Sequence, residues 1–152
     1  MGLGIIIKLY FCYMEKQINI LLVEDDEIDV MNVKRAFKKN NISNPLHVCG
    51  NGVEALDYLR SINSFIELPR IILLDINMPR MGGIEFLREL RNDDKLKHIS
   101  VFVMTTSNEE QDKVNAYKLN VAGYILKPLS IESFISSVAM LNNYWMLCEY
   151  PD

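Results

Sequence analysis

Acidic side chains stand directly after two apolar runs of the sequence. Glu24-Asp25-Asp26 follows the run Ile18 to Val23, and Asp75 follows the run Ile71 to Leu74. If both runs are neighbouring buried strands, these carboxylates meet at one edge of a sheet, where like-charge repulsion raises their energy. A hard divalent cation would neutralise them, and magnesium, which prefers oxygen ligands, is the cation that we expect.

A hydroxyl group and an ammonium group follow two further apolar runs. Thr105 ends the run Val101 to Met104, and Lys127 ends the run Tyr124 to Leu126. Ligands of open parallel sheets bind beyond the carboxyl ends of the strands, so the position of these residues indicates one shared site. Each residue also has an ordinary alternative role: a helix N-terminal acid, a strand threonine or a solvated lysine. Four strand ends with compatible chemistry favour the site.

The elements that would position these residues alternate along the chain. Five short apolar runs are separated by stretches with helical spacing, which predicts an α/β doubly wound fold. The runs are Ile18 to Val23, Leu46 to Cys49, Ile71 to Leu74, Val101 to Met104 and Tyr124 to Leu126. Their continuous apolar character is typical of a parallel sheet with helices on both faces. We expect the flavodoxin-like strand order 2-1-3-4-5, a common order of such folds, although alternation alone does not determine it.

Helical spacing and stop signals predict five helices between these strands. The first begins near Glu27 and ends at Asn40-Asn41, with Asp26 as a solvated or N-capping side chain. The others are expected over residues 52–59, after Gly82-Gly83, over residues 109–119 and over residues 131–145.

Length and composition limit the classes of protein. The 152 residues suit one domain, and the net charge of -4 argues against nucleic-acid binding. Cys12, Cys49 and Cys148 share no metal-type spacing, so they indicate reduced thiols and a cytoplasmic protein. Residues 1–13 are apolar but too short to span a membrane, and they lack a signal-peptide cleavage site. We expect them to be an extension outside the fold, which translation from Met14 would omit.

Four blocks of the sequence resemble the signature blocks of bacterial response-regulator receiver domains. They are Leu21-Leu22-Val23-Glu24-Asp25-Asp26, Leu73-Leu74-Asp75-Ile76-Asn77-Met78-Pro79-Arg80-Met81-Gly82-Gly83, Met104-Thr105-Thr106-Ser107 and Gly123-Tyr124-Ile125-Leu126-Lys127-Pro128. The resemblance covers roughly residues 18–141 and implies a receiver domain over residues 14–147 with a tail over 148–152. Thr105-Thr106-Ser107 and the segment 142–147 further resemble small stand-alone regulators that partner phytochrome-like sensor histidine kinases.

The resemblance implies a phosphoryl switch. Asp75 would accept a phosphoryl group from a phosphohistidine, Lys127 would pair with one phosphoryl oxygen, and the Thr105 hydroxyl would donate to another. Tyr124 would be the aromatic switch residue that turns inward as Thr105 moves. The Lys127–Pro128 peptide would be cis. The protein would then be a phosphoacceptor of a phosphorelay that assists its own phosphotransfer and dephosphorylation, not an enzyme with an external substrate.

The same resemblance implies the magnesium ligands. Asp25 and Asp75 would bind the ion directly, the backbone carbonyl of Asn77 would complete the protein ligands, and Glu24 would act through a water. Three carboxylates and Lys127 give the site a formal charge of -2 without metal. Magnesium would bring this charge to zero.

Three other classes of protein share parts of this pattern. A haloacid-dehalogenase-type phosphatase also forms an aspartyl phosphate, but it needs a second acid two residues after the nucleophile, where this chain has Asn77. A flavodoxin-like carrier needs a phosphate-binding loop where the acids stand. A degenerate receiver that acts only as a binding module is disfavoured by the intact Asp75, Thr105 and Lys127.

The output of such a switch would be binding, because no effector domain follows the last predicted helix. The resemblance implies a sensor histidine kinase as partner, and the composition predicts neither nucleic acid nor membrane as partners. A homodimer is a further hypothesis, through the helix 109–119, the strand of Tyr124 and the final helix. Trp145 lies at the end of that helix, where it either covers the core or contributes to an interface.

Overall fold

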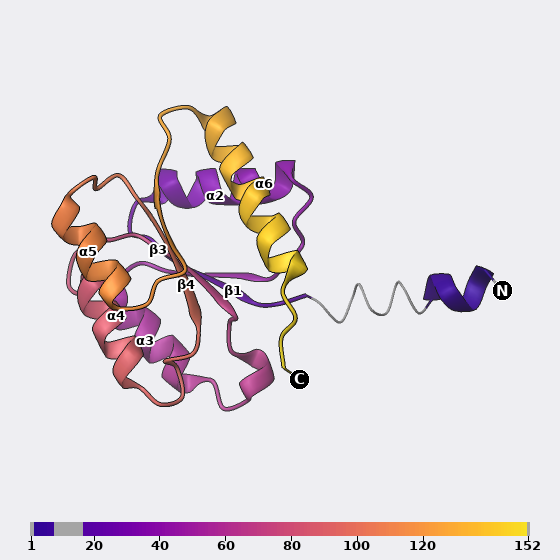
Figure 1. Cartoon of the computed structure of the whole chain (residues 1–152), viewed down its shortest axis with the longest axis horizontal. Helices are drawn as coiled ribbons and strands as arrows, with labels where there is room; N and C mark the ends of the chain where they lie inside the picture. The colour runs from indigo at the N-terminus through magenta and orange to yellow at the C-terminus, as the bar shows by residue number, and fades with distance from the viewer. Residues whose placement is uncertain (1, 8–16, 152) are drawn as a thin grey trace.

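The computed structural model describes residues 2–7 and 17–151. Its centre is a five-stranded parallel sheet in the order β2-β1-β3-β4-β5 (Figure 1). The strands are β1 (Ile20–Val23), β2 (Leu46–Cys49), β3 (Ile71–Leu74), β4 (Ser100–Thr105) and β5 (Gly123–Leu126). The strand order 2-1-3-4-5 is therefore confirmed, and each strand lies on its predicted apolar run.

Five α-helices lie within residues 17–151 and cover both faces of the sheet (Figure 1). They are α2 (Glu27–Lys39), α3 (Gly52–Ser61), α4 (Gly83–Asn92), α5 (Glu110–Lys118) and α6 (Ile131–Leu147), and a short 3-10 helix, η1, spans Phe65–Glu67. Helices α2 and α6 pack together on one face, whereas α3, α4 and α5 cover the other. Each predicted helix is present, and α3 and α6 each continue two residues beyond the predicted end.

Strands β1 and β3 are apolar at every position, and their place in the middle of the sheet explains why. Successive side chains of a strand point to opposite faces of the sheet. Leu21 and Ile72 therefore pack against α3, α4 and α5, whereas Leu22 and Ile71 pack against α2 and α6. Both faces are covered, so neither strand has a polar side.

The strand register brings the carboxyl ends of β1, β3 and β4 to one edge. Val23 pairs with Leu74, and Leu74 pairs with Val103. The residues that follow β1 and β3 therefore emerge beside each other. Gly83, the first residue of α4, lies against this edge: a Cβ atom there would be 2.5 Å from the backbone oxygen of Asp75. Only glycine permits this close approach of α4 to the end of β3.

The final helix buries Trp145. Its side chain is 2% exposed within the layer of α2 and α6, and its ring lies 6.2 Å from that of Phe37. Of the two roles considered for Trp145, the core role is confirmed and the interface role is wrong. The neighbouring Tyr144 and Leu147 are exposed. The indole group is oriented inward because the helical period places residue 145 on the same face as Leu141 and Val138.

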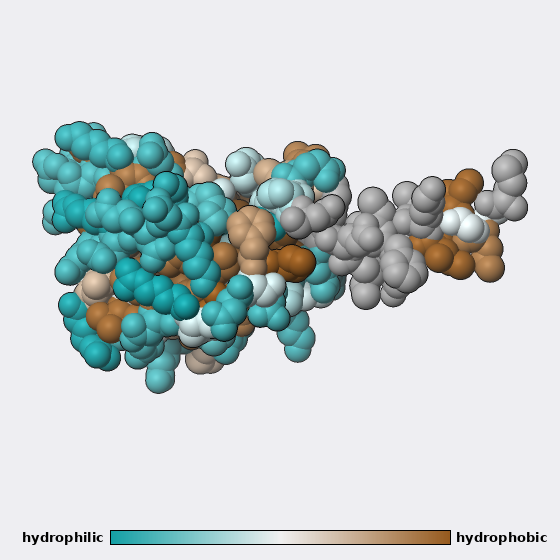
Figure 2. Space-filling view, turned by 90° about the horizontal axis from the view of Figure 1, so that it is seen from below, coloured by the Kyte–Doolittle hydropathy of each residue, from teal (hydrophilic) through white to brown (hydrophobic). Residues whose placement is uncertain are grey.

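The two ends of the described chain differ in their contacts. Tyr150 packs against the core, and the backbone oxygen of Pro151 accepts a hydrogen bond of 2.7 Å from Arg70. Residues 2–7 are helical, and their apolar side chains are exposed, as the space-filling view shows (Figure 2). The rest of the expected extension 1–13, including Cys12, lies outside the described residues. Within the described part of the chain, Cys49 and Cys148 are free thiols, and no helix is long and apolar enough to cross a membrane.

Replacing Trp145 with alanine should lower the free energy of unfolding by about 3–5 kcal/mol, because it removes a buried indole and leaves a cavity. Urea denaturation of both proteins measures the change. The control is Leu147→Ala, in the same helix but exposed, which should change stability by less than about 0.5 kcal/mol. Equal stability of the Trp145→Ala protein and the wild type would contradict the core position of this residue.

Candidate functional site

Three carboxylates converge where β1 and β3 end. Glu24, Asp25 and Asp75 each offer an oxygen atom, and these atoms lie within 4.8 Å of one another. Glu24 and Asp75 are buried, at 4% and 8% exposed, whereas Asp25 is exposed. A compact set of carboxylate oxygens with one side open to solvent suits a hard divalent cation that retains waters. The residues present therefore fit such an ion.

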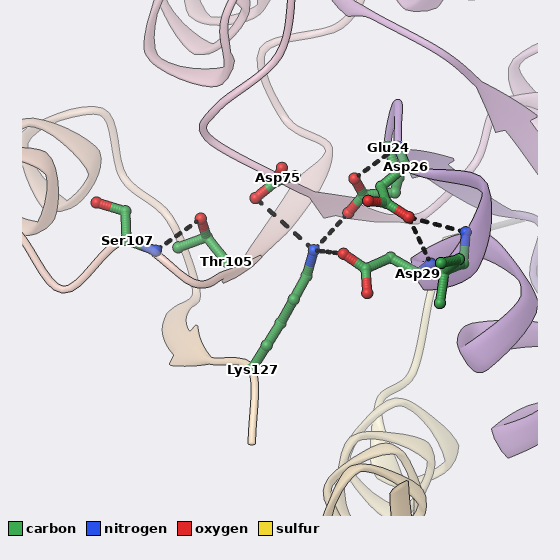
Figure 3. Close-up of polar contacts among 8 residues, drawn as sticks. Glu24, Asp26, Asp29, Asp75, Thr105, Ser107 and Lys127 are labelled. Atoms are coloured by element: carbon green, nitrogen blue, oxygen red, sulfur yellow. Dashed lines mark hydrogen bonds and ion pairs between the residues drawn. The ribbon is translucent and has the colours of Figure 1, made fainter. Parts of the chain in front are cut away.

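Lys127 places one ammonium group among these acids (Figure 3). Its Nζ lies 2.6 Å from Glu24 and 2.7 Å from Asp29, whereas Asp75 is 3.9 Å away. The residue follows β5, and its backbone N–H donates to the carbonyl oxygen of Thr105 over 2.8 Å. The pairing of β5 with β4 thus carries Lys127 to the acidic edge. Asp29 joins the site from the first turn of α2.

The electrostatics of the site reflect crowding and burial. Burial raises the pKa of Asp75, an effect that the charge of Lys127 and the Thr105 hydroxyl oppose only in part. Burial also raises the pKa of Glu24, again against the opposing effect of Lys127. For Lys127, burial lowers the pKa, but hydrogen bonds to Asp29 and Glu24 outweigh it and the net shift is upward. With Asp25, four carboxylates face one ammonium group, and the formal charge is -3.

The hydroxyl of Thr105 lies at the carboxyl end of β4, beside the loop that leads to α5. Thr105 is fully buried, and its Oγ1 accepts a hydrogen bond of 3.2 Å from the backbone N–H of Ser107 (Figure 3). The Ser107 hydroxyl donates to Asp112 over 2.6 Å, and its carbonyl oxygen accepts from the Tyr124 hydroxyl over 2.9 Å. One residue, Ser107, therefore connects the end of β4 with α5 and with β5.

Two of the predicted residues, Asp26 and Asn77, are not among the three clustered carboxylates. Asp26 caps α2, as expected, because its side chain accepts hydrogen bonds from the backbone N–H groups of Ile28 and Asp29. Asn77 is exposed in the turn between β3 and α4.

The described chain contains no cis peptide bond, so the expectation of a cis Lys127–Pro128 bond is wrong. The trans isomer is the one that the X-Pro bond favours intrinsically.

Sequence reasoning missed two residues of this site, Asp29 and Asp112, and it named Ser107 only as part of a signature block. Asp29 stands in the first turn of α2, where acids are common for reasons of the helix dipole alone. Asp112 similarly stands in the first turn of α5. Their partners lie on other elements, so only the fold identifies them.

The sequence of this chain is similar to those of known proteins over most of its length. The family model of the response regulator receiver domain matches residues 20–139. The chain is 37% identical to a probable methanogenesis regulatory protein, FilR2, of Methanothrix harundinacea over 128 residues, which cover 84% of this chain and 83% of that protein. It is 33% identical to response regulator Rcp1 of Synechocystis sp. over 129 residues, which cover 84% of this chain and 88% of Rcp1.

Solved structures show the same relationship. The phosphorylated cyanobacterial phytochrome response regulator RcpA superimposes with a TM-score of 0.80 at 31% identity, covering 90% of this chain and 99% of RcpA. The Mn²⁺-bound form of Rcp1 superimposes with a TM-score of 0.78 at 32% identity, covering 89% and 99%. The chain therefore belongs to the response regulator receiver domain family of two-component signalling systems.

Proposed function

We propose that this receiver domain accepts a phosphoryl group on Asp75 from a sensor histidine kinase and thereby changes its binding to a partner. The observation that carries the proposal is the buried Asp75 carboxylate, which shares one edge with two further acids and Lys127. An Asp75 oxygen attacks phosphorus and forms the new P–O bond. The P–N bond to the donor imidazole breaks, and its electron pair stays on the imidazole nitrogen.

Lys127 and Thr105 supply the positive charge and the hydrogen-bond donor that this transfer needs. Phosphoryl transfer spreads negative charge over three equatorial oxygens, so fixed groups around them stabilise the transition state. Lys127 pairs with one of these oxygens, and the Thr105 hydroxyl donates to another. Both groups act again when water removes the phosphoryl group. The domain thus assists its own phosphorylation and dephosphorylation without being an enzyme for an external substrate.

Magnesium is the ion that we assign to the acid cluster. When bound, it neutralises charge and orients the phosphoryl oxygens. Asp25 and Asp75 would bind it directly, Asn77 would contribute its backbone carbonyl, and Glu24 would act through a water. The tight grouping of the carboxylate oxygens supports this assignment, as does the Mn²⁺-bound form of the related Rcp1.

The switch that follows phosphorylation involves Thr105 and Tyr124. Movement of the Thr105 side chain towards a phosphoryl oxygen disturbs its hydrogen bond with the Ser107 N–H. The carbonyl oxygen of Ser107 holds the Tyr124 hydroxyl, so a shift of this loop frees the ring to turn inward. The change at Asp75 is thereby passed to the surface formed by α5 and β5.

The partner that delivers the phosphoryl group must cover the surface around Asp75. Three large apolar side chains are exposed on the segments that carry Asp29 and Lys127: Ile28 and Met31 on α2, and Leu129 two residues after Lys127. Their exposed fractions are 69%, 59% and 109%. Apolar side chains of this kind are typical of an interface. The structural neighbours named as phytochrome and bacteriophytochrome response regulators support a phytochrome-like kinase, and we place the action of this protein in the cytoplasm with that partner.

Self-association is the output that the exposed surface supports best. Exposed apolar side chains extend over α5, β5 and α6: Val114, Tyr117, Leu126, Met140, Tyr144 and Leu147. Trp145 is not among them. This face includes the strand that carries Tyr124, so a change in that ring alters the face directly.

Residues 1–13 carry no residue of the site, and we assign the chemistry to residues 14–147.

Acetyl phosphate with magnesium should add one phosphoryl group to the wild type and none to Asp75→Asn, because the amide cannot act as the nucleophile. Intact-mass spectrometry measures the adduct. Asp57→Asn is the matched control, since Asp57 is exposed on α3 and should leave the yield unchanged. An adduct of equal yield on the Asp75→Asn protein would rule out this assignment.

Without metal, Asp75→Asn should be more stable than the wild type at neutral pH, by roughly 1 kcal/mol. The folded-state pKa of Asp75 is raised above 3.8, so folding loses free energy as the pH rises from the unfolded-state pKa, and the loss is complete above the folded-state pKa. The advantage should disappear as the pH falls to about 4, where the unfolded carboxyl is half protonated. Urea unfolding at several pH values measures the difference.

Magnesium should reverse this order. It binds only the folded wild type with the full carboxylate set, and a 100-fold excess over Kd contributes about 2.7 kcal/mol. The Asp75→Asn protein should gain much less. Equal stabilisation of both proteins would show that the ion does not bind at Asp75.

Beryllofluoride with magnesium should shift the wild type from monomer towards dimer in sedimentation velocity experiments. Tyr117→Glu should remain monomeric, because a charge at the centre of an apolar interface is costly to bury. The control is Ile66→Glu, which adds the same charge to an exposed apolar residue of η1. A wild type that stays monomeric in both states would contradict self-association.

A further inference from the structure

The ammonium group of Lys127 does not lie closest to the carboxylate on which the proposed chemistry occurs. Its two short contacts are with Glu24 and Asp29, at 2.6 and 2.7 Å, and Asp75 at 3.9 Å is beyond hydrogen-bond distance (Figure 3). An ammonium group has three N–H donors, and two of them are already used.

The position of Asp29 does not depend on Lys127. Its backbone N–H donates to the capping carboxylate of Asp26 over 3.2 Å, which fixes the first turn of α2. The Asp29 side chain extends from this anchored turn to the ammonium group (Figure 3). Asp29 is thus a counter-ion whose backbone is anchored independently of Lys127.

We propose that Asp29 is a positioning residue that holds Lys127 away from Asp75 in the unphosphorylated protein and releases it when Asp75 is modified. The inference rests on the proposed phosphoryl transfer to Asp75. The ammonium group changes partner, from a carboxylate on α2 to an oxygen of the phosphoryl group.

The burial of the two carboxylates determines which one gives up Lys127. The Glu24 side chain is 3% exposed, so the loss of its ammonium partner would leave a charge without solvent. The Asp29 side chain is 32% exposed, and water can replace the ammonium group there at lower cost. Asp29 is therefore the contact that breaks first.

A competing interpretation assigns Asp29 to α2 alone. Acids in the first turn of a helix interact favourably with the helix dipole. Glu27 also lies in the first turn of α2 and carries the same charge, but it makes no described contact with Lys127. It supplies a matched control, because Glu27→Gln removes an equal charge from the same turn.

The test is the affinity of the full-length protein for beryllofluoride, a mimic of the phosphoryl group on Asp75, at saturating magnesium. Asp29→Asn should tighten binding by about three- to tenfold, because the competing carboxylate of a charged hydrogen bond is lost. Asp29→Ser should tighten binding to a similar extent. Agreement between the two variants would show that the effect comes from the loss of the carboxylate and not from the new amide group. Glu27→Gln should change the affinity by less than about twofold.

A double-mutant cycle shows whether the effect passes through Lys127. In a Lys127→Gln background, Asp29→Asn should no longer tighten binding, since the ammonium group for which Asp29 competes is absent. An unchanged or weaker affinity of Asp29→Asn overturns the inference, and so does an equal gain in the Lys127→Gln background. Absence of magnesium-dependent binding to the wild type overturns the proposed function, and the inference with it, so the two failures are distinguishable.

Discussion

Crowded negative charge at one edge of the sheet is the constraint on which this structure depends. Parallel, in-register strands deliver Glu24 and Asp75 to the same place, and burial removes much of the water that would screen them. Lys127 is the cation that the described fold supplies there, and it cannot balance four carboxylates. The site therefore retains excess negative charge that a divalent cation would neutralise. Burial of Asp75 and Glu24 raises the pKa of both carboxyl groups, which shows that their charged forms are poorly solvated.

Rigid packing behind this edge keeps the charges together. Close contact of Gly83 with the backbone of Asp75 fixes the start of α4 against β3. At the opposite edge, the guanidinium group of Arg91 donates hydrogen bonds to four backbone carbonyls: Lys97, Ile99, Leu119 and Asn120. These bonds tie the C-terminal end of α5 to α4. The N-terminal end of α5 is instead connected to the site through Ser107 and Asp112, so a shift at Thr105 reaches that end first.

Two hydrogen-bonded connections lead away from Lys127 and Thr105, the neighbours of Asp75, and they leave on opposite sides (Figure 3). One passes from Lys127 to Asp29 on α2, beside the exposed Ile28 and Met31. The other passes from Thr105 through Ser107 to Tyr124. The first lies on the side where we place the donor kinase, and the second on the side where we place self-association. The proposed kinase-binding surface and the proposed self-association surface therefore lie on opposite sides of Asp75.

Features that depend on neighbours along the chain were determined by the sequence. Apolar runs identified each strand, and the place of Asp26 directly before a helical pattern identified it as a cap, because period and capping are local properties. The polar ends of those runs also identified Glu24, Asp75, Thr105 and Lys127.

Tertiary structure decided what joins residues far apart in the chain. Asp29 and Lys127 are separated by 98 positions, and their contact exists only because β5 pairs with β4 and α2 packs beside the edge. Trp145 is similar: an apolar residue at a helix end suits a core or an interface equally well, and the packing of α6 on α2 decides between them. Periodicity specifies which face of an element is apolar, whereas the partner of that face depends on how all the elements pack together.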